Sequence, residues 1–175
     1  MVISRVSALG AVAALGTVGP LALLPALSAE RADPGDVKLL EGALELELAA
    51  IKAYGDAAAG NLSAPVAATL MQFSNDHSAH RDALLALVQQ AGQTPGTDAA
   101  TVPAVVQPQL ERDALAGALT LERQLASSYL AAVPEFKNRD LAKTAASILG
   151  VDATHVALLS EALRENPAYP GGFLA

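Results

Sequence analysis

The sequence has no cysteine and no tryptophan, and aromatic residues make up only 3% of its 175 positions. The lack of cysteine excludes disulfides, thiolate zinc sites, iron–sulfur clusters and cysteine nucleophiles. The chain is 52% apolar and rich in alanine and leucine. This composition favours closely packed helices over sheets, whose strands prefer β-branched and aromatic side chains. It also provides enough apolar surface for the core of one ordinary domain.

Basic residues are scarce along the whole chain. Lysine and arginine together number 11, aspartate and glutamate number 18, and the formal net charge is −7. No basic cluster appears in the body of the sequence. We therefore expect no nucleic-acid partner, because phosphate contacts need a concentrated basic face.

The N-terminal 29 residues have the pattern of a secretory signal peptide. Residues 1–5 are short and positively charged, and residues 6–27 are apolar. The small residues Ser28 and Ala29 then precede the polar body, as at a cleavage site. The pattern predicts an exported protein of the periplasm, the cell envelope or the medium, with no other membrane contact. An uncleaved anchor is the alternative, because the apolar run is long enough to span a bilayer.

The body of the chain, residues 30–165, predicts four helices and no strand. We expect helices over about residues 34–59, from the N-cap Ser63 to about 92, over 109–133 and over 138–164, followed by an irregular tail at 166–175. The 17 residues 92–108 are rich in proline and glycine. Extended, they could cover on the order of 55 Å, whereas a helix of about 25 residues is about 38 Å long. The fold class is therefore all-α: two antiparallel hairpins joined by a long crossover linker.

Polar residues interrupt the apolar seam of every expected helix near its middle. They are Glu47 in the first segment, His77 and His80 in the second, Glu122 in the third, and Asp152 and His155 in the fourth. An internal repeat relates the two halves: Glu47, Tyr54 and His80 recur 75 residues later as Glu122, Tyr129 and His155. We therefore expect the six polar residues to meet in one buried layer.

A layer of this kind is typical of a metal site. An unpaired buried carboxylate costs several kcal/mol, and no lysine or arginine lies on the seams to neutralise it. A divalent cation is the natural counter-charge. His77 and His80 are three residues apart, as are Asp152 and His155, so each pair lies on one helix face. Oxygen and imidazole ligands without sulfur suit iron, manganese or zinc.

This ligand pattern resembles that of the ferritin-like di-iron carboxylate bundles. In those proteins one glutamate comes from each of two helices, and a Glu-x-x-His motif comes from each of the other two. Here the resemblance covers about residues 35–165. It implies Glu47, His77, His80, Glu122, Asp152 and His155 as metal ligands, with iron as the first candidate. It also implies that Tyr54 and Tyr129, each seven residues after a glutamate, hydrogen-bond to a ligand carboxylate from another helix.

Two departures from the family pattern put a full di-iron centre in doubt. Where the family has a glutamate, the second helix has His77, and the fourth helix has the shorter Asp152. One metal ion, or a pair of unlike ions, is the alternative. Asp76 is a substitute for the missing carboxylate, but it lies about 100° around the helix from the seam and ranks second.

Three classes of function fit these expectations. The first is a redox protein that oxidises a metal ion or disposes of peroxide, and the second binds a metal outside the cytoplasm without turnover. The third is a metal-free structural or stress-associated bundle, in which the glutamates and histidines are ordinary buried pairs. The absence of a Cys-x-x-Cys iron module argues against an electron-fed peroxidase of the rubrerythrin type. Catalytic turnover and homo-oligomer formation stay open.

Overall fold

The computed structural model describes residues 32–100 and 110–165. Within these ranges the chain forms four α-helices, a single 3-10 turn and no strand. The helices are α1 (Pro34–Ala58), α2 (Ala64–Gln90), α3 (Glu111–Ala132) and α4 (Arg139–Leu163), with the turn η3 (Val133–Glu135) between the last two. The all-α fold class is confirmed, and each predicted helix differs from the observed one by only one or two residues at its ends.

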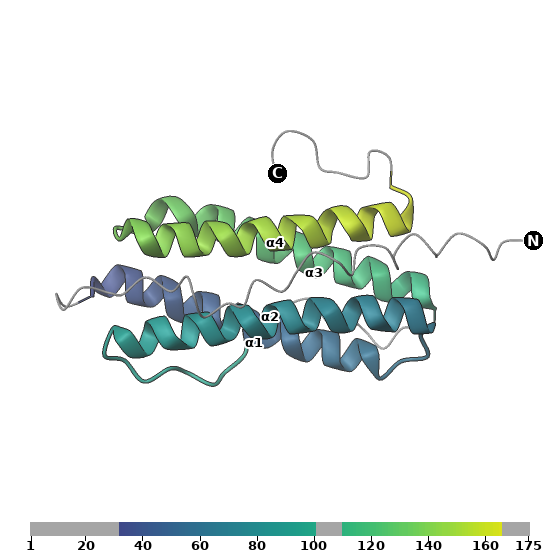
Figure 1. Ribbon diagram of the computed structural model, residues 1–175, viewed down its shortest axis with the longest axis horizontal. Coiled ribbons are helices and arrows are strands. Elements are labelled where there is room, and N and C mark those ends of the chain that lie inside the picture. Colours follow the sequence, from purple (N-terminus) through teal and green to yellow (C-terminus); the bar gives the residue numbers. More distant parts are fainter. Residues whose placement is uncertain (1–31, 101–109, 166–175) are drawn as a thin grey trace, which may run out of the picture.

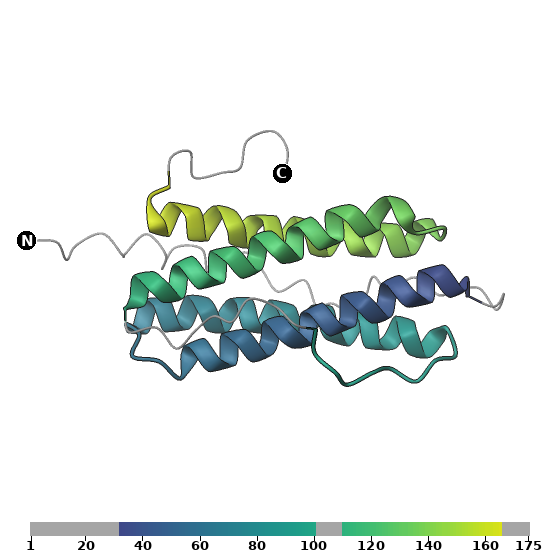
Figure 2. The ribbon, with the colours of Figure 1, turned by 180° about the vertical axis from the view of Figure 1, so that it is seen from behind.

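The helices form two antiparallel hairpins that pack side by side (Figure 1). Helix α1 pairs with α2, and α3 pairs with α4; across the bundle α1 contacts α3 and α2 contacts α4. Helices α2 and α3 run in the same direction, and residues 91–100, the described part of the connection between them, turn back along the bundle from the end of α2 (Figure 2). The described part of this linker is tied to α1, because the backbone N–H of Ala100 donates to the carbonyl of Glu45 at 2.9 Å.

Local sequence signals explain where the helices begin and end. Asp33 caps α1 and accepts a hydrogen bond from the backbone of Gly35, and Asn138 caps α4 in the same way. Arg164 has a φ of 57° and ends α4 in the left-handed conformation. Ser63 does occupy the N-cap position of α2, as predicted, but its side chain makes no capping bond. Instead its backbone N–H donates to Glu111 at 2.7 Å, which fastens the start of α2 to the start of α3.

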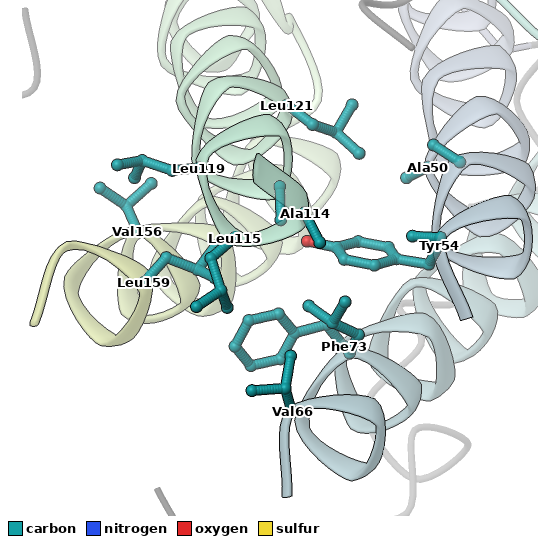
Figure 3. Packing of buried hydrophobic residues seen from close by; sticks show 14 of the residues in the cluster. Ala50, Tyr54, Val66, Phe73, Ala114, Leu115, Leu119, Leu121, Val156 and Leu159 are labelled. Atoms are coloured by element: carbon teal, nitrogen blue, oxygen red, sulfur yellow. The ribbon is translucent and has the colours of Figure 1, made fainter. Parts of the chain in front are cut away.

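The apolar core is divided into two clusters. One lies toward the α1–α2 turn and includes Tyr54, Phe73, Leu121 and Leu159, and the other lies toward η3 and includes Leu40, Leu84, Leu141 and Ile148. Figure 3 shows the first cluster, in which the ring of Tyr54 crosses the core with its hydroxyl directed away from its own helix. The polar layer predicted from the seams occupies the height between the two clusters.

A buried carboxylate outside this layer connects the first turn of α1 to the residues that precede α4. Asp36, in the first turn of α1, is only 2% exposed. Its two oxygens accept the backbone N–H groups of Lys137 and Asn138 at 2.8 and 2.9 Å. These residues form the entry to α4, so one side chain fixes the start of the first helix against the start of the last.

Asp36→Ala should destabilise the protein by about 1–3 kcal/mol, because it leaves two partly buried backbone donors without their acceptor. Urea denaturation of the metal-free protein measures this loss. Asp82→Ala is the control, since Asp82 is exposed and bonds only to its neighbour Arg81, and its effect should stay within about 0.5 kcal/mol. Equal effects of the two substitutions would contradict a structural role for Asp36.

Two of the sequence predictions lie outside the described residues: the signal peptide at 1–29 and the irregular tail at 166–175. Within the described ranges, one helix is long and apolar enough to cross a membrane by length and composition. That helix is α4, which carries Asp152 and His155 on its buried face and packs against α3. These features are typical of the core helix of a bundle.

Candidate metal centre

The six side chains predicted as metal ligands lie in one layer at mid-height of the bundle. Each helix contributes to it: Glu47 from α1, His77 and His80 from α2, Glu122 from α3, and Asp152 and His155 from α4. Five of them are buried, and the side chain of His80 is only 12% exposed. The seam spacing brings them together because positions three or four residues apart share the helix face directed at the bundle axis, and the polar residues interrupt each seam near the middle of its helix.

His77 lies at the centre of the layer, between the two glutamates. Its Nδ1 is 2.8 Å from Glu47 Oε2, and its Nε2 is 3.0 Å from Glu122 Oε1. The ring stacks on Tyr54, with centroids 5.5 Å apart and planes inclined by 19°. The imidazole therefore bridges α1 and α3 from its position on α2.

Two tyrosines reach across the bundle to the glutamates of the opposite hairpin. The hydroxyl of Tyr129 on α3 donates to Glu47 Oε1 at 2.6 Å, and the hydroxyl of Tyr54 on α1 donates to Glu122 Oε1. Burial and the charge of the accepting glutamate raise the pKa of each tyrosine well above its usual value, so each hydroxyl keeps its proton. The cross-helix bonds implied by the ferritin-like pattern are present; their role in orienting ligands stays a prediction.

His155 is held between α2 and α3. Its Nε2 lies 3.2 Å from Asp76 Oδ2, and its Nδ1 lies 3.3 Å from Glu122 Oε2. The ring of Phe73 stacks on it, with centroids 3.9 Å apart. Asp76, the second-ranked candidate for a substitute ligand, contacts Nε2 of His155, whereas Nδ1 of that ring faces Glu122. The side chain of Asp76 is 34% exposed.

Several polar atoms of the layer have no hydrogen-bond partner among the described residues. They are both oxygens of Asp152, Oε2 of Glu122, Nδ1 of His155 and Nδ1 of His80. Buried polar atoms of folded proteins are nearly always paired. Two groups of side chains could each hold a metal ion, because the ligand atoms within each group all lie within 4.8 Å of one another. One group is His77, Glu122, Asp152 and His155, and the other is Glu47, His77 and His80.

The glutamates and histidines stabilise one another's charged forms. Burial by itself raises the pKa of Glu47 and of Glu122, but hydrogen bonds from the histidines outweigh it and lower each pKa to about 2. Burial likewise lowers the pKa of His77, but its bonds to Glu122 and Glu47 raise that pKa well above the usual value. In the metal-free protein His77 therefore donates a proton from each nitrogen and supplies one positive charge between the two glutamates.

This pairing gives the glutamates a counter-charge within the protein, as in the alternative of ordinary buried glutamate–histidine pairs. Asp152 differs from them. Burial raises the pKa of Asp152 well above its usual value, and the nearby charges of Glu122 and Glu47 raise it further. The seams carry no lysine or arginine, but a histidine with two carboxylate neighbours supplies the same positive charge.

A family comparison identifies the protein class. The family model for the ferritin-like domain matches residues 35–165, which contain all four helices and the whole layer. The chain belongs to the ferritin-like family. The resemblance inferred from the glutamate, histidine and tyrosine pattern is thereby confirmed.

The ferritin-like fold also appears in a solved structure, that of a conserved hypothetical protein, rv2844, from Mycobacterium tuberculosis. It is 24% identical to this ferritin-like chain with a TM-score of 0.67, and the match covers 75% of this chain and 92% of that one. At this identity the likeness shows the fold alone. No curated protein matches the chain.

The metal-free protein should lose stability as the pH rises from 6.5 to about 9. Burial opposes a charge on His155, but its contact with Asp76 and its ion pair with Glu122, 3.2 and 3.3 Å away, raise its pKa to about 9. A raised histidine pKa contributes stability that is complete below about pH 6.5 and is lost as the pH passes the folded-state value, here up to about 3 kcal/mol. Urea denaturation in chelator at pH 6, 7.5 and 9 measures this loss.

Asp76→Asn is the matched variant for this pH series. It keeps the shape of the side chain but removes the first of the two bonds that raise the His155 pKa. The loss of stability at alkaline pH should become smaller and should be complete at a lower pH, because the folded-state pKa of His155 falls. An unchanged pH profile in Asp76→Asn would show that Asp76 does not control His155.

Proposed function

We propose that this ferritin-like protein is exported and binds one or two divalent metal ions in its polar layer, with iron as the first candidate and manganese or zinc as alternatives. The observation that carries the proposal is Asp152, whose two buried oxygens have no hydrogen-bond partner in the described part of the chain. A buried carboxylate in that state is destabilising unless a cation or a proton joins it.

The donor set fits such an ion. Glu122 Oε2 and His155 Nδ1 are also without hydrogen-bond partners in the described ranges, and they lie 3.3 Å apart. Carboxylate and imidazole groups without sulfur are ligands of iron, manganese and zinc. The tyrosine hydroxyls and Asp76 would hold these ligands in place, as outer partners do in metal proteins.

The metal-free structural bundle is the second candidate, and a specific observation favours it. His77 pairs with both Glu47 and Glu122 at hydrogen-bond distance, and His155 Nδ1 lies 3.3 Å from Glu122 Oε2. Two protonated histidines therefore match the charge of the two glutamates without any ion. The two candidates differ in Asp152. In a purely structural layer its unpaired oxygens would be a defect, whereas in a metal site they are ligands.

Asp152→Asn separates the two candidates. In the wild type, added Fe²⁺, Mn²⁺ or Zn²⁺ should raise the melting temperature relative to chelator, because a bound ligand at 100-fold excess over its Kd stabilises the fold by about 2.7 kcal/mol. Asp152→Asn should lose this response. Without metal it should be at least as stable as the wild type at neutral pH, because it removes a carboxylate whose pKa is raised by burial and by its acidic neighbours.

The opposite pair of results would contradict the metal proposal: no cation changes the melting temperature of the wild type, and Asp152→Asn destabilises the protein in chelator. For a protein that does bind iron, optical spectra during peroxide addition then separate redox turnover from simple metal binding. A change in the spectrum that recurs with each addition indicates turnover.

Export is tested on protein isolated from the native host. The charged start, apolar run and small-residue exit predict a mature chain that begins near Ala29 or Glu30. N-terminal sequencing of the protein outside the cytoplasm should find that start. A soluble cytoplasmic protein with an intact Met1 would show that the segment is not a signal peptide.

A further inference from the structure

The two halves of the polar layer are related by the 75-residue repeat but are chemically unequal. Glu47 corresponds to Glu122, and His80 corresponds to His155. At the next pair the repeat breaks, because His77 on α2 corresponds to Asp152 on α4. One half therefore has two carboxylates and the other has one.

The carboxylate oxygens also differ in how far they are already engaged. On the α1 side, Glu47 Oε1 accepts from Tyr129 and Oε2 lies 2.8 Å from His77 Nδ1, so both oxygens are occupied. On the α3–α4 side, Glu122 Oε2 and both oxygens of Asp152 have no hydrogen-bond partner within residues 32–100 and 110–165. In the described part of the chain, the buried carboxylate oxygens of the layer that lack a hydrogen-bond partner therefore all lie on the α3–α4 side.

His77 belongs to both groups of side chains, but it can serve only one of them. A neutral imidazole has one nitrogen with a lone pair and one N–H, so it offers a metal a single donor atom. Nδ1 faces Glu47 at 2.8 Å and Nε2 faces Glu122 at 3.0 Å. With its hydrogen on Nδ1 donated to Glu47, the ring turns the lone pair of Nε2 toward Glu122 and Asp152.

His155 is held in the corresponding way. Its Nε2 lies 3.2 Å from the carboxylate of Asp76, which leaves Nδ1 directed at Glu122 Oε2, 3.3 Å away. A carboxylate behind a histidine fixes the tautomer and the ring orientation of a metal ligand. No carboxylate among residues 32–100 and 110–165 supports His80 in this way. Its Nδ1 is 3.6 Å from Glu47 Oε2, and Val151 occupies the position that corresponds to Asp76.

The distances and the charges agree with one ion at this place. Two ligand atoms that are each about 2.0–2.2 Å from a common ion lie about 3.0–3.5 Å apart at usual coordination angles. His77 Nε2 lies 3.0 Å from Oε1 of Glu122 and His155 Nδ1 lies 3.3 Å from Oε2, so both distances fall in this range. Glu122 and Asp152 balance the charge of one divalent cation, while the third carboxylate, Glu47, keeps its hydrogen bonds with Tyr129 and with Nδ1 of His77.

We propose that the layer binds a single divalent cation, held by Glu122, Asp152, His155 Nδ1 and His77 Nε2, while Glu47 and Asp76 act as positioning residues behind the two histidines. This specifies the site of the proposed function and rests on it. It reassigns Glu47 from ligand to the hydrogen-bond partner of a ligand, and it removes His80 from the ligand set.

Two histidine variants 75 residues apart test the proposal. The purified mature chain, His80→Ala and His155→Ala are each titrated with Fe²⁺ under argon, Mn²⁺ and Zn²⁺, and the bound ions are counted by native mass spectrometry. The wild type should bind one ion per chain. His155→Ala should raise the Kd by about 10–100-fold or more, whereas His80→Ala should change it by less than about threefold. Circular dichroism and thermal melts in chelator show that each variant is folded.

Electron paramagnetic resonance of the Mn²⁺-loaded wild type gives an independent reading, since one ion per chain gives the signal of an isolated Mn²⁺ without exchange coupling. Two ions per chain, a coupled signal, or equal weakening by the two histidine variants would overturn the single-ion site while leaving metal binding intact. If none of the three cations binds the wild type, the proposed function fails together with this inference.

Discussion

The structure depends on one constraint: charged side chains are buried at the centre of a bundle whose core is otherwise mostly apolar. Glu47, His77 and Glu122 form a chain of hydrogen-bond contacts across three helices, and every atom of that chain is removed from water. Such an arrangement is stable only when its charges are matched and its bonds are made, because one missing partner leaves an uncompensated buried charge. The apolar clusters above and below the layer can pack in many ways, whereas the layer accepts only one register of the four helices.

The same constraint explains the supporting residues around the layer. Tyr54 and Tyr129 supply hydroxyl donors to carboxylate oxygens that water cannot reach, and Phe73 fixes the plane of the His155 ring by stacking on it. The ring of each of these side chains packs in the apolar core, and each also contacts a glutamate or a histidine of the polar layer. The aromatic residues are few, and three of the six phenylalanines and tyrosines in the sequence are used at this one place.

Much of the fold and of the layer could be predicted from the sequence, because seam spacing gives both the height and the direction of a side chain on a helix. Ser63 marks the start of α2, and the length of the linker at 92–108 predicts the direction of α3. Spacing does not tell which ring nitrogen faces which neighbour, so the role of His77 as partner of two glutamates was missed. Asp76 and Asp36 were also missed or misjudged, since their contacts depend on how α2 meets α4 and on how α1 meets the turn before α4.

The crosswise tyrosine bonds have a consequence for how the chain folds. Each hairpin contains a glutamate whose hydroxyl donor belongs to the other hairpin, so neither half can supply all the partners of its own buried carboxylate. A hairpin that formed alone would keep that carboxylate in water and leave its apolar seam uncovered. The docking of the two halves is then the step that makes burial favourable, and folding of the two hairpins becomes one cooperative transition. The repeat that divides the sequence into two similar units thus produces a domain that cannot be divided.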